Sequence, residues 1–256
     1  MKTKTEIVEN WLPRYTGCSL KDFGQYILLT NFSHYLELFA EWNNVKIPNT
    51  QVPMPCVTAN NITMINFGMG SPNAATIMDL LSAIHPKAAL FLGKCGGLKK
   101  KNELGDYILP IAAIRSEGTS NDYLPPEIPA LPAFKLQIAV SNSIKEFNKD
   151  YWTGTVLTTN KRVWEYDDRF KKYLRKTRSM AIDMETATIF TVGFANQIPT
   201  GALLLVSDQP MISAGIKTDK SDQKITNKYV EEHVKIGINA LREIQANSES
   251  VKHVIF

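Results

Sequence analysis

Two acidic residues follow two consecutive predicted strands in the second half of the chain. Glu185 comes directly after the run 180–184, which is apolar except for Asp183, and Asp208 comes two positions after the apolar run 201–206. Ligands of open α/β sheets bind at the carboxyl ends of strands, so both acids face the usual ligand position. A carboxylate there can accept hydrogen bonds from a sugar diol, and an acid whose pKa is raised by burial can protonate a departing base nitrogen. The alternative for Asp208 is a structural cap on the following turn.

A glycine-rich segment, residues 68–73, follows a predicted strand and precedes a helical apolar pattern. Ser71 is suited to cap that helix, and Pro72 is suited to be its first residue. Glycines such as Gly70 let the backbone approach a ligand, and the free N–H groups of a helix N-terminus can bind a phosphate or a sugar. We therefore expect a binding loop here, with a simple strand-to-helix turn as the alternative.

Lys94, Cys95 and Gly96 belong to a second glycine-rich segment, residues 93–97, which also follows a predicted strand. A glycine-dense loop that carries one lysine suits an anion. It is not a Walker loop, because the glycine spacing differs and no Ser or Thr follows the lysine. A flexible turn with a solvent-exposed lysine is an equally good interpretation of this segment.

The densest polar stretch of the chain is residues 114–123. Arg115 offers a planar guanidinium for a phosphate, and Thr119 and Ser120 offer hydroxyl groups. Long loops often carry function, so we expect phosphate contacts from this one. The alternative is a solvated loop in which Glu117 neutralises the arginine.

Residues 158–166 combine charged and aromatic side chains. Trp164 or Tyr166 could stack on a flat base, and Asn160 could hydrogen-bond to the edge of that base. A tryptophan in such a place more often serves packing alone, so the sequence leaves both interpretations open.

The elements that must position these residues alternate along the chain. The expected strands are 26–30, 61–67, 88–92, 106–114, 153–157, 180–184 and 201–206. The expected helices are one within 5–24 that is followed by a turn, 35–42, 74–84, 131–147, one beginning at 186, and 227–246. This alternation predicts an α/β fold, and we find no repeat or linker that would divide the chain. We therefore expect residues 1–256 to form a single domain.

Composition limits the class of protein further. The chain has 256 residues, 44% hydrophobic and 21% charged, and a mild net charge of +4. No apolar run is long enough to span a membrane, the N-terminus does not resemble a signal peptide, and the basic runs lack the aromatic interleaving of nucleic-acid-binding proteins. Three cysteines far apart in sequence and four scattered histidines predict free thiols, no metal and a cytoplasmic protein. We expect no cofactor.

Taken together and in this order, the motifs resemble the nucleoside phosphorylase/nucleosidase superfamily. Within it, the closer resemblance is to the catalytic domain of the AMP nucleosidases, over roughly residues 25–240. The segments that carry this resemblance are 68–76, 93–98, 117–123 and 183–185. The resemblance implies a mixed, twisted central sheet flanked by helices and a homo-oligomer, either a hexamer or a trimer of dimers. It also implies hydrolysis of AMP to adenine and ribose 5-phosphate in purine salvage.

The resemblance also implies roles for individual residues. Glu185, with Met184 beside it, would hold the ribose hydroxyls, and Asp208 would donate a proton to N7 of the adenine. Trp164 would lie in the base pocket. The residues implied near the phosphate are Arg115, Lys94 and Thr119.

The chain departs from the phosphorylase pattern at three positions. Tyr35 and Phe91 stand where the phosphorylases carry arginines for free phosphate, and Lys94 stands where they carry Ser or Thr. This disfavours phosphorolysis and leaves the group that activates water open, with Glu185 and the substrate phosphate as candidates. Only about 25 residues precede the first strand, so we expect no separate regulatory domain. A purine nucleoside phosphorylase and a non-catalytic nucleotide-binding module are the alternative functions.

Overall fold

The central strands are apolar on both faces, which explains why helices cover the sheet from both sides. The computed structural model describes residues 2–247 and buries every residue of its first strand, β1 (Tyr26–Thr30). Ile27 and Leu29 belong to one hydrophobic cluster, whereas Tyr26 and Leu28 belong to another. Because successive side chains of a strand point to opposite faces, an uninterrupted apolar run fits a strand that is buried on both faces.

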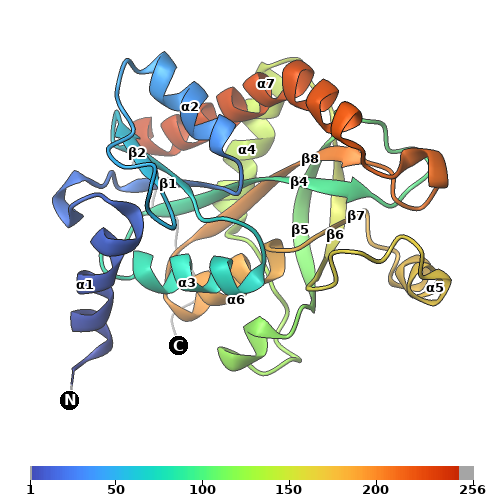
Figure 1. The fold of residues 1–256 in the computed structure, drawn as a ribbon, viewed down its shortest axis with the longest axis horizontal. Coiled ribbons are helices and arrows are strands. Elements are labelled where there is room, and N and C mark those ends of the chain that lie inside the picture. Colours follow the sequence, from blue (N-terminus) through green and yellow to red (C-terminus); the bar gives the residue numbers. More distant parts are fainter. Residues whose placement is uncertain (1, 248–256) are drawn as a thin grey trace.

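Eight strands form one sheet within the described residues (Figure 1). In chain order they are β1, β2 (Cys56–Ala59), β3 (Ile62–Asn66), β4 (Ala88–Gly97), β5 (Tyr107–Ser116), β6 (Tyr151–Thr159), β7 (Ala181–Asp183) and β8 (Thr200–Asp208). Their order across the sheet is β2-β3-β1-β4-β7-β6-β5-β8, and β8 also pairs with β4, so the strands from β4 onward close a ring. Parallel pairs such as β4–β8 occur beside antiparallel pairs such as β4–β7, which confirms the mixed sheet.

The helices form a layer on each face of this sheet (Figure 1). They are α1 (Lys4–Thr16), α2 (Ser33–Trp42), α3 (Ser71–Leu81), α4 (Phe134–Glu146), α5 (Asp168–Thr177), α6 (Thr186–Ala195) and α7 (Asp219–Ala246), with short 3₁₀ helices η1 (Leu20–Asp22), η2 (Thr119–Asp122) and η3 (Ser213–Gly215). Buried side chains of α1, α3 and α6 pack on one face, and those of α2, α4 and α7 pack on the other. The expected α/β class is confirmed.

The segment 93–97 is not the loop that the sequence predicts, because it continues β4. Its backbone pairs with β8 and, at Gly96 and Gly97, with β7. The glycines are needed for close packing: a Cβ at Gly96 would lie 2.7 Å from Pro210, and one at Gly93 would lie 2.5 Å from the Phe91 ring. Glycine density therefore marks a tightly packed strand here.

Two helical segments differ from the sequence prediction because they are polar. α7 begins at Asp219, eight residues before the expected start, with Thr218 as its N-cap in a capping box with Ser221. α5 is absent from the prediction, since Leu174 is its one fully buried residue. Neither segment has the apolar periodicity that identifies a helix in a sequence.

The cysteines differ partly from expectation. Cys18 and Cys56 are paired as a disulfide, so the prediction of three free thiols is wrong for these two, whereas Cys95 is free and buried. The two cysteines are 38 residues apart, and this spacing alone does not predict a pairing. Cys18 lies between α1 and β1 and Cys56 lies in β2, and these segments are brought together by the tertiary fold. Among the described residues, no helix combines the length and the apolar character needed to cross a membrane.

Candidate active site

A cavity of about 250 Å³ lies where several strands end. Asn31 follows β1, Thr159 ends β6, Asp183 ends β7 and Asp208 ends β8, and all four line the cavity. The central strand β4 contributes Lys94, Cys95 and Gly96. The carboxyl ends of two sets of strands that run in opposite directions, β1 with β8 and β6 with β7, thus converge on one space. Carboxyl ends of strands are the usual ligand position in α/β sheets.

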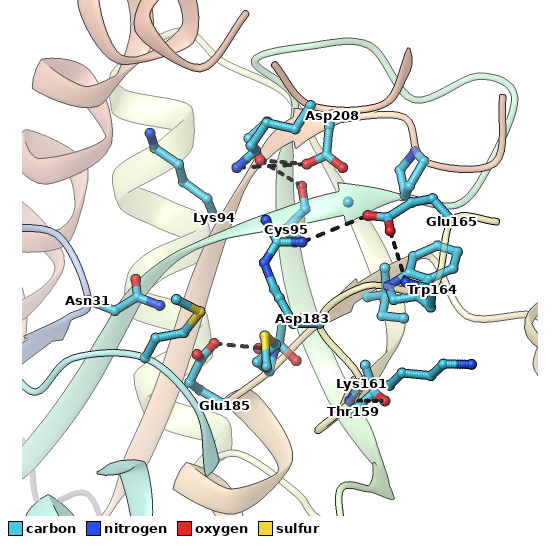
Figure 2. Close-up of a pocket in the computed structure, with 18 of the residues that line it drawn as sticks. Asn31, Lys94, Cys95, Thr159, Lys161, Trp164, Glu165, Asp183, Glu185 and Asp208 are labelled. Atoms are coloured by element: carbon cyan, nitrogen blue, oxygen red, sulfur yellow. Dashed lines mark hydrogen bonds and ion pairs between the residues drawn. The ribbon is translucent and has the colours of Figure 1, made fainter. Parts of the chain in front are cut away.

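Figure 2 shows how the polar side chains surround this space. Glu185 and Asp208 lie on opposite sides of Cys95, with Lys94 and Asn31 toward one end and Trp164 and Glu165 toward the other. The two acids that the sequence singles out, Glu185 and Asp208, therefore line one cavity. One end of this cavity carries polar side chains, and the other carries an aromatic ring beside a carboxyl group.

Glu185 is held at the start of α6 and is only 2% exposed. Its Oε1 accepts a hydrogen bond from the backbone N–H of Gly70 at 2.7 Å, and its Oε2 accepts one from the N–H of Met184 at 3.2 Å. Burial, and next the neighbouring Asp183, raise the pKa of Glu185 to about 8. The first glycine loop thus positions the carboxylate, and Gly70 reaches the site through this contact.

Asp183 anchors the strand that carries Glu185. Its Oδ1 accepts a hydrogen bond from Thr158 Oγ1 at 2.7 Å, and its Oδ2 accepts bonds from the N–H and the hydroxyl of Thr186 at 2.8 and 2.5 Å. Burial raises the pKa of Asp183, against the lowering effect of these donors. Both of its oxygens are therefore occupied by the protein itself.

Asp208 ends β8 with a side chain that is 13% exposed. Ser207 Oγ donates to its Oδ1 at 2.8 Å, and Lys217 Nζ lies 3.9 Å from the same oxygen. Burial raises the pKa of Asp208, although Lys217 opposes the shift. A carboxyl group whose proton is retained to higher pH, at the wall of a cavity, is suited to act as an acid.

Lys94 is the most enclosed cation of the cavity, with a side chain that is 3% exposed. Its ammonium donates to Asp222 Oδ1 at 2.9 Å and to Thr226 Oγ1 at 2.8 Å, and it lies 4.7 Å from the centre of the Phe32 ring. Burial lowers its pKa, and Asp222 counteracts that effect. Two of the three donors of Lys94 are thus used within the protein.

Trp164 both packs and faces the cavity. It is 4% exposed and meets Phe170 edge-on at 5.4 Å, in a small cluster with Leu174 and Ile182. Its ring also lines the cavity beside Glu165. The two interpretations that the sequence left open are therefore compatible, and base stacking stays a prediction.

The loop after β5 has a different character. The Arg115 guanidinium donates to Ser120 Oγ at 2.8 Å, to Asn121 Oδ1 at 3.1 Å and to the carbonyls of Leu124, Pro125 and Ile128 at 2.5–2.9 Å. Glu117 accepts from the N–H and hydroxyl of Ser120, and Asn160 donates to the Glu117 carbonyl. None of Arg115, Thr119, Ser120 and Asn160 is among the residues that line the cavity in the described chain. Their roles toward phosphate and base stay predictions.

Several residues that line the cavity were not among the site residues predicted from the sequence. Asn31 and Phe32 follow β1, and the rule that ligands bind at strand ends would have found them. Lys217 and Asp222 precede and begin α7, and no motif marks them. They reach the cavity because this segment packs beside β4 and β8, which is a property of the fold.

The arrangement can stabilise separation of charge in a bound sugar derivative. A carboxyl group with a raised pKa on one wall can supply a proton to a leaving group, and a carboxylate on the opposite wall can hold hydroxyl groups. The aromatic ring of Trp164 offers a flat surface at the end that Asp208 and Glu165 share. These are the requirements for cleaving a bond between a sugar and a nitrogenous base.

Comparison with known proteins assigns the family. The model of the phosphorylase superfamily matches residues 25–242, and the chain belongs to this superfamily. The chain is 31% identical to an AMP nucleosidase of Escherichia coli K12 over 93% of its own length, although it spans only 58% of that relative. It is 26% identical to a guanosine phosphorylase of Halorubrum lacusprofundi, with 80% of this chain and 83% of the relative covered.

Solved structures agree with this family. An AMP nucleosidase from Bacteroides thetaiotaomicron is 60% identical and superimposes with a TM-score of 0.87, over 96% of this chain and 99% of that one. A purine nucleoside phosphorylase from Toxoplasma gondii in complex with immucillin-H has a TM-score of 0.80 at 20% identity, over 90% and 95% of the two chains. The second likeness concerns the fold alone.

Proposed function

We propose that this protein hydrolyses the N-glycosidic bond of AMP and releases adenine and ribose 5-phosphate. The observation that carries the proposal is the pair of acids on opposite walls of one cavity, Asp208 with a raised pKa and Glu185 held by two backbone N–H groups. The 60% identity to a protein named AMP nucleosidase supports the choice of substrate.

In the proposed reaction, Asp208 protonates N7 of adenine while the bond between C1′ and N9 breaks. Protonation lets the base leave as a neutral molecule, which lowers the barrier for a step that leaves positive charge on the sugar. Glu185 accepts hydrogen bonds from the ribose hydroxyls, and its negative charge stabilises the sugar cation. Met184 lies beside it, and Trp164 faces the base.

Hydrolysis is favoured over phosphorolysis by three side chains. Tyr35 is buried and hydrogen-bonds to His233 at 3.0 Å, and Phe91 is fully buried, so neither position offers a charge to free phosphate. Lys94, which replaces a Ser or Thr of the phosphorylases, is paired with the carboxylate of Asp222. A carboxylate at this place repels an incoming phosphate dianion.

The broader setting of the proposal follows the family. We propose a cytoplasmic homo-oligomer, a hexamer or a trimer of dimers, that acts on a small nucleotide in purine salvage and binds neither nucleic acid nor membranes. The exposed apolar side chains of Val163, Tyr166 and Tyr173, on and before α5, support contact with a second copy near the cavity. Sedimentation velocity of the purified protein tests the assembly.

The activity is tested by incubating the protein with AMP, with and without inorganic phosphate, and separating the products. Adenine and ribose 5-phosphate in both mixtures support the proposal, whereas release that depends on phosphate would favour a phosphorylase. Binding of AMP without adenine release would favour a non-catalytic nucleotide-binding module. Adenosine serves as the comparison substrate, because a preference for adenosine would contradict AMP as the substrate.

A further inference from the structure

The proposed hydrolysis needs a group that accepts a proton from water, and residues 2–247 contribute five carboxyl groups to the lining of the cavity. They belong to Glu165, Asp183, Glu185, Asp208 and Asp222. Each can be assessed from its contacts and its position relative to the proposed leaving group.

Four of the five are committed to other tasks. Asp183 has both oxygens hydrogen-bonded to Thr158 and Thr186, and Glu185 has both bonded to backbone N–H groups. Asp208 is the proposed proton donor. Glu165 accepts the N–H of Trp164 at 2.9 Å and lies beside Trp164, at the end of the cavity where the proposal places the base.

Asp222 lies at the other end of the cavity. Its Oδ1 accepts from Lys94, and Lys94 and Asn31 occupy the end opposite Trp164 in Figure 2. The Asp222 side chain is 37% exposed, so water can reach it. The carboxylate thus lies beside the enclosed Lys94, at the end of the cavity that is open to water.

The separation of Asp222 from Asp208 is limited by a shared neighbour. Lys217 Nζ lies 3.9 Å from Asp208 Oδ1 and 3.5 Å from Asp222 Oδ1, so these two oxygens are at most about 7.4 Å apart. Glycosidases that invert configuration place their acid and their base about 6.5–9.5 Å apart, which leaves room for a water molecule. The limit is compatible with that arrangement and puts both carboxyl groups within reach of one substrate.

We propose that Asp222 is the general base of the reaction, resting on the AMP hydrolysis proposed above. The bond between C1′ and N9 breaks, and its electron pair goes to adenine, which takes a proton from Asp208. A water oxygen forms the new bond to C1′ on the opposite face, and the water proton passes to Asp222. The first product is the α anomer of ribose 5-phosphate, after which Asp208 regains a proton from solvent and Asp222 loses one.

The electrostatic environments of the two acids fit these opposite roles. Lys94 and Lys217 lower the pKa of Asp222 despite partial burial, whereas burial raises the pKa of Asp208. Burial, and next the negative charge of Asp222, raise the pKa of the Tyr35 phenol. Asp222 is therefore ionised at a pH where Asp208 still holds its proton, and such divergent pairs mark an acid and a base.

The test compares three variants with the wild type by steady-state AMP hydrolysis. Asp222→Asn keeps an oxygen for Lys94 but cannot accept a proton, and we expect kcat to fall by about 10²-fold with KM for AMP changed less than about threefold. Asp219→Asn is the matched control, because it removes an exposed carboxylate from the same first turn of α7. This control is expected to retain wild-type kcat.

Chemical rescue separates catalysis from structural support. In Asp222→Ala, sodium azide is expected to restore adenine release and to yield a glycosyl azide, because the azide anion attacks C1′ without losing a proton. Wild-type kcat in Asp222→Asn would overturn the assignment, as would loss of activity that azide does not restore. If the wild-type protein releases no adenine, both the proposed function and this inference are wrong. If the wild-type protein is active and Asp222→Asn is equally active, only this inference is wrong.

Discussion

The walls of the cavity and the loop after β5 are both rich in polar residues that follow strands, yet they differ in how those residues are satisfied. In the loop, the guanidinium of Arg115 makes five hydrogen bonds, all to oxygens of the loop itself. Glu117 in turn accepts hydrogen bonds from Ser120. In the cavity, Asp208 and Asp222 face a shared space and are bridged by one lysine. Polar composition alone does not distinguish a binding site from a loop that is stabilised by its own hydrogen bonds. The two differ in how many hydrogen-bonding groups are left available to a ligand.

The strongest test of this contrast is Asp208→Asn. The amide cannot donate the acidic proton that the leaving adenine needs, so kcat is expected to fall by about 10³-fold, within the usual range for loss of a general acid. Rapid separation of adenine from AMP measures the rate. A fall smaller than about tenfold would contradict the role of Asp208.

Glu185→Gln is expected to have the next largest effect. The amide keeps the shape but loses the negative charge near the sugar cation, and kcat/KM for AMP is expected to fall by about 10²-fold. Circular dichroism establishes that the variant is folded. Unchanged kcat/KM in a folded variant would show that Glu185 serves the protein alone.

The pH profile gives a third test, with a change of about tenfold per pH unit on each limb. Because the pKa of Glu185 is raised to about 8, its carboxylate form increases as the pH rises toward that value, and activity increases with it. The acidic form of Asp208 is lost as the pH rises through its own raised pKa, so activity falls again. In Asp208→Asn the alkaline limb of kcat/KM should disappear, and its persistence would assign that limb to another group.

Arg115→Met tests whether the loop after β5 serves stability and not substrate binding. Loss of hydrogen bonds from a charged donor is expected to lower the free energy of unfolding by about 2 kcal/mol, while KM for AMP stays within about twofold. Thermal unfolding and steady-state kinetics measure the two effects, with the exposed Arg14 changed to Met as the control. A large rise in KM without loss of stability would instead support the phosphate role that the family resemblance implies.

The sequence was sufficient for the elements that are long and apolar. The strand β1 and the end of β8 were predicted because uninterrupted apolar runs identify doubly buried strands, and this placed Asp208 correctly at a strand end. The family motif placed Glu185 beside Met184, and the structure adds the N–H of Gly70 as its support. These features are local in sequence, which is why they could be predicted.

The features that sequence missed depend on distant contacts. The segment around Lys94 was expected to be a loop, but pairing with β8 extends it as a strand, and its lysine is paired with Asp222, 128 residues later. Likewise, Arg115 has the composition of a phosphate ligand but turns toward its own loop. Such choices between partners are made by the tertiary fold, and a single sequence does not contain them as a pattern.

The most direct test of the central claim compares AMP with 7-deaza-AMP, in which a carbon replaces N7 of the purine. If Asp208 cleaves the bond by protonating N7, the analogue is expected to bind with an inhibition constant close to the KM for AMP and to release base at least about 10³-fold more slowly. Asp208→Asn should then cause little further loss with the analogue. Cleavage of 7-deaza-AMP at a rate close to that of AMP would contradict the account.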